Sequence, residues 1–138
     1  MPTLMVSISG VRGIIGDGLE PEVLVKYTAA YADFIGKGKV VVGRDARISG
    51  EMVNNIVTGT LIAKGLDVID IGICPTPTVQ YNVKTLKAHG GIAISASHNP
   101  NEWNALKLLN NTGQFLSPDE FEKMQNFLIN EKHTYQTW

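Results

Sequence analysis

The feature that most limits the fold of this chain is an alternation of short apolar runs with longer amphipathic segments. The apolar runs are rich in Val and Ile, have the length of buried strands, and lie at residues 39–43, 67–71 and 90–95. Apolar residues recur at helical spacing in the segments at residues 21–36, 49–65 and 76–87. Strands that alternate with helices form βαβ units with right-handed crossovers. The sequence therefore predicts an α/β protein, a three-layer α/β/α sandwich with a mainly parallel sheet.

The two ends of the chain depart from this alternation. A short apolar segment at residues 4–8 is followed by GVRGIIG at residues 10–16, where the glycines predict a loop that turns around Arg12. Near the other end, the turn sequence NNTG lies within residues 105–116 and predicts a hairpin, which would make the sheet mixed. The sequence SPDE at residues 117–120 matches a capping box, so a last helix is expected to begin there.

The size, charge and cysteine content of the chain exclude several classes of protein. A length of 138 residues suits one ordinary domain, so residues 1–138 are expected to form a single domain. Because 12 Lys and Arg balance 13 Asp and Glu, we expect neither a nucleic acid nor a membrane as partner. The single cysteine, Cys74, cannot form an internal disulfide, and we find no secretory leader. These features indicate a cytoplasmic protein.

Three polar loops, around Arg12, Arg44 and Ser97, are predicted to follow strands. Ligands of open α/β sheets gather at the carboxyl ends of the strands, so we expect these loops to share one site. Arginine forks bind phosphate oxygens and glycine-rich loops present N–H groups to anions, which favours a phosphate ligand. The sequence contains no dinucleotide-binding or P-loop fingerprint and no nucleophile elbow of an α/β-hydrolase.

The sequences of these loops resemble those of a known family when they are taken together. In chain order they are SGVRG at residues 9–13, GRDAR at 43–47, PTP at 75–77 and SASHNP at 95–100, followed by Asn104 and Lys107. This set resembles the α-D-phosphohexomutases, which include phosphoglucomutase, phosphomannomutase and phosphoglucosamine mutase. The resemblance implies that the chain is domain I, the N-terminal phosphoserine domain of a longer four-domain enzyme.

The resemblance also implies a reaction and its cofactors. Phosphohexomutases move a phosphoryl group between the 1 and 6 positions of a hexose phosphate, through a phosphoserine and a bisphosphate intermediate, and Ser97 matches the phosphorylated serine. Family members use Mg²⁺, held by one phosphoserine oxygen and by aspartates of the following domain. The metal ligand expected in this chain is therefore Ser97, through its phosphate, and an activator of the glucose 1,6-bisphosphate type is implied. We expect the isolated chain to be inactive without the remaining domains.

The residues near Ser97 receive roles from the same resemblance. Lys107, ten residues later, matches a lysine that acts as general acid or base, and Arg12 matches an active-site arginine. A cation beside Lys107 would lower its pKa toward the range that proton transfer needs. His98 and Asn99 are expected to shape the serine loop, with His98 touching the phosphate. All five residues are predicted to bind the phosphate of the substrate.

Two arginines and one departure from the family pattern complete this interpretation. Arg44 and Arg47 are expected either to support the serine loop or to add positive potential. Many relatives have glycine where this chain has Ala105. Because alanine is unfavourable at positive φ, the backbone is expected to be ordinary at that position.

Two other functions compete with this hypothesis. A sugar-phosphate-binding module could retain the same loops without catalysis, and binding measurements with hexose phosphates and Mg²⁺ would identify it. A serine hydrolase that used Ser97 and His98 is disfavoured, because adjacent residues seldom orient as nucleophile and base.

Overall fold

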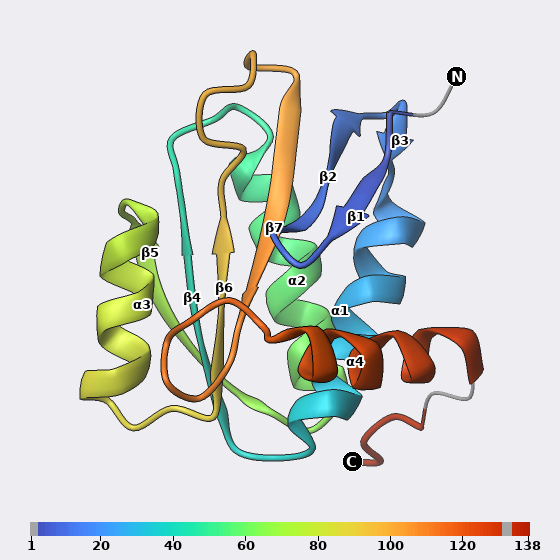
Figure 1. Cartoon of the computed structure of the whole chain (residues 1–138), viewed down its shortest axis with the longest axis vertical. Helices are drawn as coiled ribbons and strands as arrows, with labels where there is room; N and C mark the ends of the chain where they lie inside the picture. Colours follow the sequence, from blue (N-terminus) through green and yellow to red (C-terminus); the bar gives the residue numbers. More distant parts are fainter. Residues whose placement is uncertain (1–2, 131–133) are drawn as a thin grey trace.

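One mixed sheet, with helices on both of its faces, forms the body of the molecule (Figure 1). The computed structural model describes residues 3–130 and 134–138. Its strands are β1 (Met5–Ser7), β2 (Gly10–Ile15), β3 (Gly18–Leu19), β4 (Lys39–Arg44), β5 (Asp67–Ile73), β6 (Gly90–Ile94) and β7 (Trp103–Leu109). Its helices are α1 (Pro21–Ile35), α2 (Gly50–Ala63), α3 (Thr76–Thr85) and α4 (Pro118–Asn130). The predicted α/β fold is confirmed.

The strands lie in the order β1-β2-β7-β6-β4-β5, with β3 beside β2. Strand β4 pairs in parallel with both β5 and β6. Strand β7 pairs antiparallel with β6 on one side and with β2 on the other, and β1 is antiparallel to β2. Strands β1 and β7 therefore run against the direction shared by the others, which makes the sheet mixed and mainly parallel.

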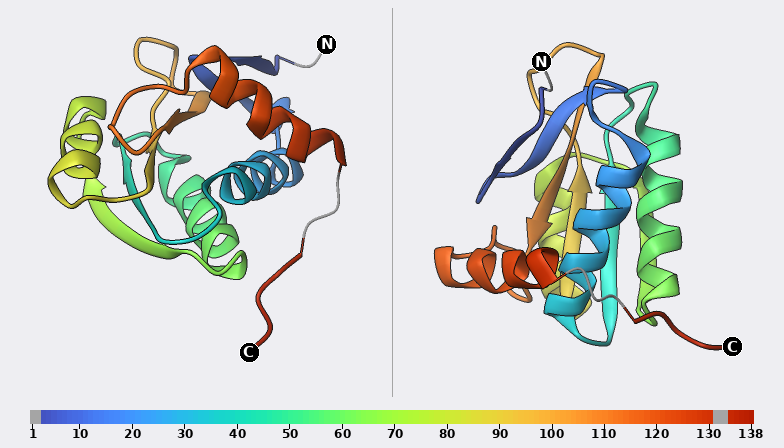
Figure 2. Two further views of the ribbon diagram at one scale, coloured as in Figure 1. Left: turned by 60° about the horizontal axis from the view of Figure 1, so that its bottom comes forward. Right: turned by 90° about the vertical axis from the view of Figure 1, so that its right-hand side faces the viewer.

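The two faces of the sheet carry separate apolar cores because side chains alternate along each strand. Val41 of β4 packs in a cluster with Val79 and Val83 of α3. Its neighbours Val40 and Val42 belong to a larger cluster on the opposite face, which α1 and α2 cover. Helix α4 packs against α1 and crosses its axis in the right-hand view of Figure 2. The result is the predicted arrangement of three layers.

The capping box at the start of α4 is confirmed. The Ser117 N–H donates to Glu120 Oε1 at 2.9 Å, and the Glu120 N–H donates to Ser117 Oγ at 3.2 Å. These reciprocal bonds satisfy two donors that the first turn of the helix leaves open. None of the helices in residues 3–130 and 134–138 combines the length and the apolar character needed to cross a bilayer.

The glycine-rich segment at residues 10–16 is a strand over most of its length, so the prediction of a loop there is wrong. Strand β2 pairs with β1 along one edge and with β7 along the other, and these ladders hold residues 10–13 in extended backbone. Gly10 allows β2 to approach β7 closely, since an added Cβ would overlap the carbonyl oxygen of Leu106. Gly10 therefore serves close strand packing rather than a turn, whereas Gly16, with a φ of 83°, lies in the turn that follows β2.

The hairpin predicted for residues 105–116 is reduced to one isolated bridge, between Leu109 and Phe115. The turn itself forms, because the Asn110 N–H donates to the Gln114 carbonyl oxygen at 2.8 Å. Strand β7 instead finds its long-range partners in β2 and β6. Local turn chemistry correctly placed a reversal but could not identify these partners.

We expect the substitution Gly10→Ala to destabilise the domain by about 3 kcal/mol, because the new methyl group would collide with the backbone of β7. Gly10 also has a φ of 126°, which L side chains rarely adopt. Gly16→Ala is the matched control: its φ is 83°, but nothing lies within 4 Å of the added Cβ, so about 1 kcal/mol is expected. Chemical denaturation of both variants measures the difference, and equal losses would contradict the steric explanation.

Candidate functional site

Ser97 lies in a turn at the carboxyl end of β6, and its side chain is exposed. Its φ is 54°, an uncommon conformation for a residue other than glycine. The turn is held by local hydrogen bonds: the Ser97 N–H donates to Ser95 Oγ at 3.2 Å, and the Asn99 N–H donates to the Ala96 carbonyl oxygen at 3.0 Å. A hydroxyl that extends from such a constrained turn is accessible to a reacting group.

Lys107 of β7 is the residue that the structure brings closest to this hydroxyl. Its side-chain Nζ lies 2.5 Å from Ser97 Oγ and 3.5 Å from Thr76 Oγ1, and the residue is only 7% exposed. Burial lowers the pKa of the lysine below its ordinary value of 10.5, and the charges of Arg12 and Arg47 lower the pKa further, while Asp45 opposes them. The amine therefore lies within hydrogen-bond distance of the serine and has a pKa below the ordinary value of a lysine.

Arg12 reaches the same loop from β2, where it pairs with Ala105 of β7. Its Nη1 donates to Asn99 Oδ1 at 2.9 Å, and the side chain is half-buried. This bond joins the loop to the neighbouring strand. Ala105 lies in extended backbone, as the sequence predicted for this position.

Arg47, in the segment between β4 and α2, donates hydrogen bonds along the whole serine loop. Its Nε lies 3.0 Å from Asp45 Oδ2. Its two terminal nitrogens donate to four backbone carbonyl oxygens: Nη1 to Pro100 and Trp103 at 2.6 and 3.2 Å, and Nη2 to Ser97 and Asn99 at 2.9 Å each. Of the two roles left open for this arginine, the contacts favour support of the loop.

His98 and Arg44 are less engaged than the other predicted residues. His98 follows Ser97 and is exposed, and no hydrogen bond of its imidazole occurs within the described residues. Its contact with a phosphate stays a prediction. Arg44 donates to the carbonyl oxygen of Asp45 at 3.5 Å, a long and weak contact.

Sequence reasoning missed the contributions of Thr76 and Asn104. Thr76 begins α3, and its hydroxyl is the second partner of the Lys107 ammonium. Asn104 is fully buried, and its Nδ2 donates to Ser49 Oγ at 2.9 Å, which ties β7 to the start of α2. Both lie in the quoted motifs, so the signal was present, but their partners come from distant segments.

The described residues contain no group of three or more His, Cys, Asp or Glu side chains that could hold a metal ion. Asp45 is the acidic residue whose charge acts on the pKa of Lys107. Both of its carboxylate oxygens accept hydrogen bonds from Arg47. A divalent cation at this site could therefore draw only on Ser97, through a phosphate, and on ligands from outside the described residues. The described residues therefore do not supply a complete set of metal ligands by themselves.

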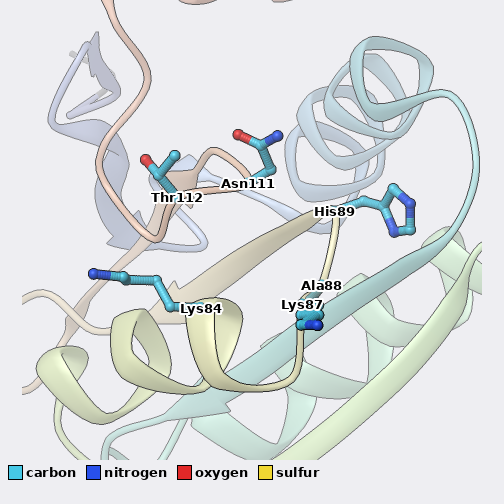
Figure 3. Close-up of a pocket in the computed structure, with 6 residues that line it drawn as sticks. All are labelled: Lys84, Lys87, Ala88, His89, Asn111 and Thr112. Atoms are coloured by element: carbon cyan, nitrogen blue, oxygen red, sulfur yellow. The ribbon is translucent and has the colours of Figure 1, made fainter.

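A hollow of about 430 Å³ lies at the opposite end of the sheet, near the start of β6 (Figure 3). It is lined by Lys84, Lys87, Ala88, His89, Asn111 and Thr112. Figure 3 shows that the Lys84 and His89 side chains point away from each other, so the polar groups do not converge on a ligand. A smaller hollow adjoins the serine loop beside Arg47 and Asn99. Another lies beside Arg12 and is lined by Met5, Ser7 and Ser9. The convergent chemistry is at the serine end.

Comparisons with known proteins agree with one another. The family model described as phosphoglucomutase/phosphomannomutase, alpha/beta/alpha domain I, matches residues 4–134. A phosphoglucosamine mutase of Alkaliphilus metalliredigens is 41% identical over 128 residues, which cover 89% of this chain and 28% of that protein. A phosphoglucosamine/phosphogalactosamine mutase of Sulfurisphaera tokodaii is 39% identical over 130 residues, which cover 94% of this chain and 29% of that protein. The crystal structure of a candidate phosphomannomutase of Thermus thermophilus superimposes with a TM-score of 0.84 at 30% identity, covering 91% of this chain and 30% of that one.

Proposed function

The chain belongs to the phosphoglucomutase/phosphomannomutase family, and on that premise we propose that it is the phosphoserine-bearing domain of a phosphohexomutase. It spans less than a third of the length of the relatives cited above. The sugar would therefore be bound jointly with further domains. The observation that carries the proposal is the contact between the exposed Ser97 hydroxyl and the buried Lys107 amine.

In the proposed reaction, Ser97 gives and regains a phosphoryl group. When a sugar hydroxyl attacks the phosphoserine, the bond between phosphorus and Ser97 Oγ breaks, and protonated Lys107 donates its proton to the departing oxygen. The proton of the sugar hydroxyl passes to a base that the remaining domains must supply. When Ser97 Oγ attacks the hexose bisphosphate, neutral Lys107 takes the serine proton back. The lowered pKa of Lys107 supports both directions, because it brings the neutral form within reach.

The other predicted residues would stabilise the charge that accumulates on the phosphoryl oxygens. Asn99 orients the Arg12 guanidinium, which can donate to a phosphate on Ser97. The exposed His98 can reach the oxygens of the same phosphate. Bound Mg²⁺ would neutralise part of this charge, and this chain would offer it one oxygen of the phosphate on Ser97. A bisphosphate of the glucose 1,6-bisphosphate type would reload the serine. A cytoplasmic location stays a prediction from the sequence.

Phosphopeptide mapping of the full-length protein, with and without glucose 1,6-bisphosphate and Mg²⁺, tests this proposal. We expect phosphate on Ser97 after treatment, and we expect the isolated 138-residue chain not to interconvert glucose 1-phosphate and glucose 6-phosphate. A protein that binds hexose phosphates but never carries phosphate on Ser97 would instead be the sugar-phosphate-binding module. Turnover by the isolated chain would contradict the need for further domains.

A further inference from the structure

We infer that Arg47 is a positioning residue, whose fork-shaped guanidinium holds the Ser97 loop in the geometry that phosphoryl transfer requires. This inference rests on the proposed function of Ser97. It concerns a residue for which the sequence left two roles open, support of the loop or a contribution to the positive potential.

The hydrogen bonds assign Arg47 to support of the loop, although its charge also lowers the pKa of Lys107. An arginine side chain has five N–H donors and no acceptor. Arg47 makes five side-chain hydrogen bonds, one to Asp45 and four to carbonyl oxygens of the serine loop. No donor is then left for a phosphate, so Arg47 does not bind the substrate as Arg12 is proposed to do.

Asp45 fixes the direction of the fork. Its Oδ1 accepts the backbone N–H of Arg47 at 3.2 Å, and its Oδ2 accepts the side-chain Nε at 3.0 Å. With one edge of the guanidinium held in this way, the two terminal nitrogens face the loop. Planar, bidentate recognition of this kind is a property of arginine that lysine does not share.

The four carbonyl contacts extend from Ser97 to Trp103, which covers the connection between β6 and β7. Lys107 stands on β7, so the two reacting residues lie on opposite ends of this connection. The β6–β7 ladder and the bond from the Ser95 N–H to the Ala105 carbonyl oxygen, at 3.1 Å, hold only the base of this connection. Arg47 binds the part beyond it, from Ser97 to Trp103. Loss of the fork would let the serine move relative to the lysine, and a displacement of about 1 Å can cost roughly 100-fold in rate.

The variant Arg47→Lys tests the inference because it keeps the charge and removes the fork. In the full-length protein, we expect the rate of Ser97 phosphorylation by glucose 1,6-bisphosphate to fall roughly 100-fold, with KM for the bisphosphate changed less than about threefold. Hydrogen exchange at the Asn99 and Trp103 amides, which are bonded within the loop, should accelerate while exchange in the sheet stays slow.

Arg44→Lys is the matched control, since it makes the same chemical change in a residue with one weak contact. We expect it to leave the phosphorylation rate within about twofold of the unmodified protein. If Arg47→Lys fails to fold, Asp45→Asn decides the question: it removes the negative charge and one of the two acceptor oxygens that hold the backbone N–H and the side-chain Nε of Arg47, and it should slow phosphorylation by about tenfold.

Two results would overturn the inference. Phosphorylation of Arg47→Lys at the unmodified rate would show that the charge suffices, and unchanged exchange at Asn99 and Trp103 would show that the loop does not depend on the fork. If the unmodified protein never accepts phosphate on Ser97, the proposed function is refuted. The exchange measurement would still test whether the Arg47 guanidinium holds the loop.

Discussion

Replacing Ser97 with alanine is expected to reduce hexose phosphate turnover in the full-length enzyme proposed above by at least about 10⁴-fold. The reason is covalent: alanine has no oxygen to accept the phosphoryl group, and the Lys107 amine then has no hydroxyl at hydrogen-bond distance on that loop. A coupled assay that follows glucose 6-phosphate formation from glucose 1-phosphate measures the loss.

The fold should survive this substitution because Ser97 is exposed, and circular dichroism should show unchanged secondary structure. Ser95→Ala is the control for the loss of a nearby hydroxyl. Ser95 accepts the Ser97 N–H without touching Lys107, so we expect a decrease of less than about tenfold. Turnover by Ser97→Ala close to that of the unmodified enzyme would mean that another group accepts the phosphate.

The central part of the fold could be predicted because its pattern is local. The run at residues 39–43 is apolar throughout, which is typical of a strand covered on both faces, and the structure confirms β4 between β5 and β6. The strand β2 could not be predicted in this way. Its glycines have turn propensity, and the partners that hold it extended, β1 and β7, include a strand more than 80 residues away in the sequence.

The residues of the candidate site could likewise be predicted only in part. Ser97 and Lys107 could be singled out because their residue types carry chemistry and the loop motif is specific. For Arg47 the sequence left two roles open, since four of its five side-chain partners are backbone carbonyl oxygens, which any residue type supplies. Thr76 was missed for another reason: only the folded chain brings α3 beside Lys107.

Lys107→Met is expected to lower turnover by about 10²- to 10⁴-fold, the usual contribution of a general acid or base. Its effect should depend on pH. In the proposed reaction neutral Lys107 takes the serine proton. Because the pKa of Lys107 lies below 10.5, the rate of Ser97 phosphorylation should rise with pH through that lowered pKa. The variant should lose this rise, which initial rates of phosphorylation across alkaline pH would measure.

The same substitution should stabilise the 138-residue chain at neutral pH, raising Tm by about 3 °C, because methionine fills the space without burying a charge beside Arg12. The sign follows from the lowered pKa: the folded state binds the Lys107 proton less well than the unfolded state, so the unmodified chain gains stability as pH rises from the folded pKa toward 10.5. The gain in Tm from Lys107→Met should therefore shrink with rising pH in thermal denaturation.

Thr76→Val, which removes the weaker hydrogen-bond partner of the amine, serves as the control and should show a smaller change in Tm. A Lys107→Met chain that is less stable at neutral pH would mean that the amine stabilises the fold. The argument that Lys107 destabilises the fold and is retained for catalysis would then fail.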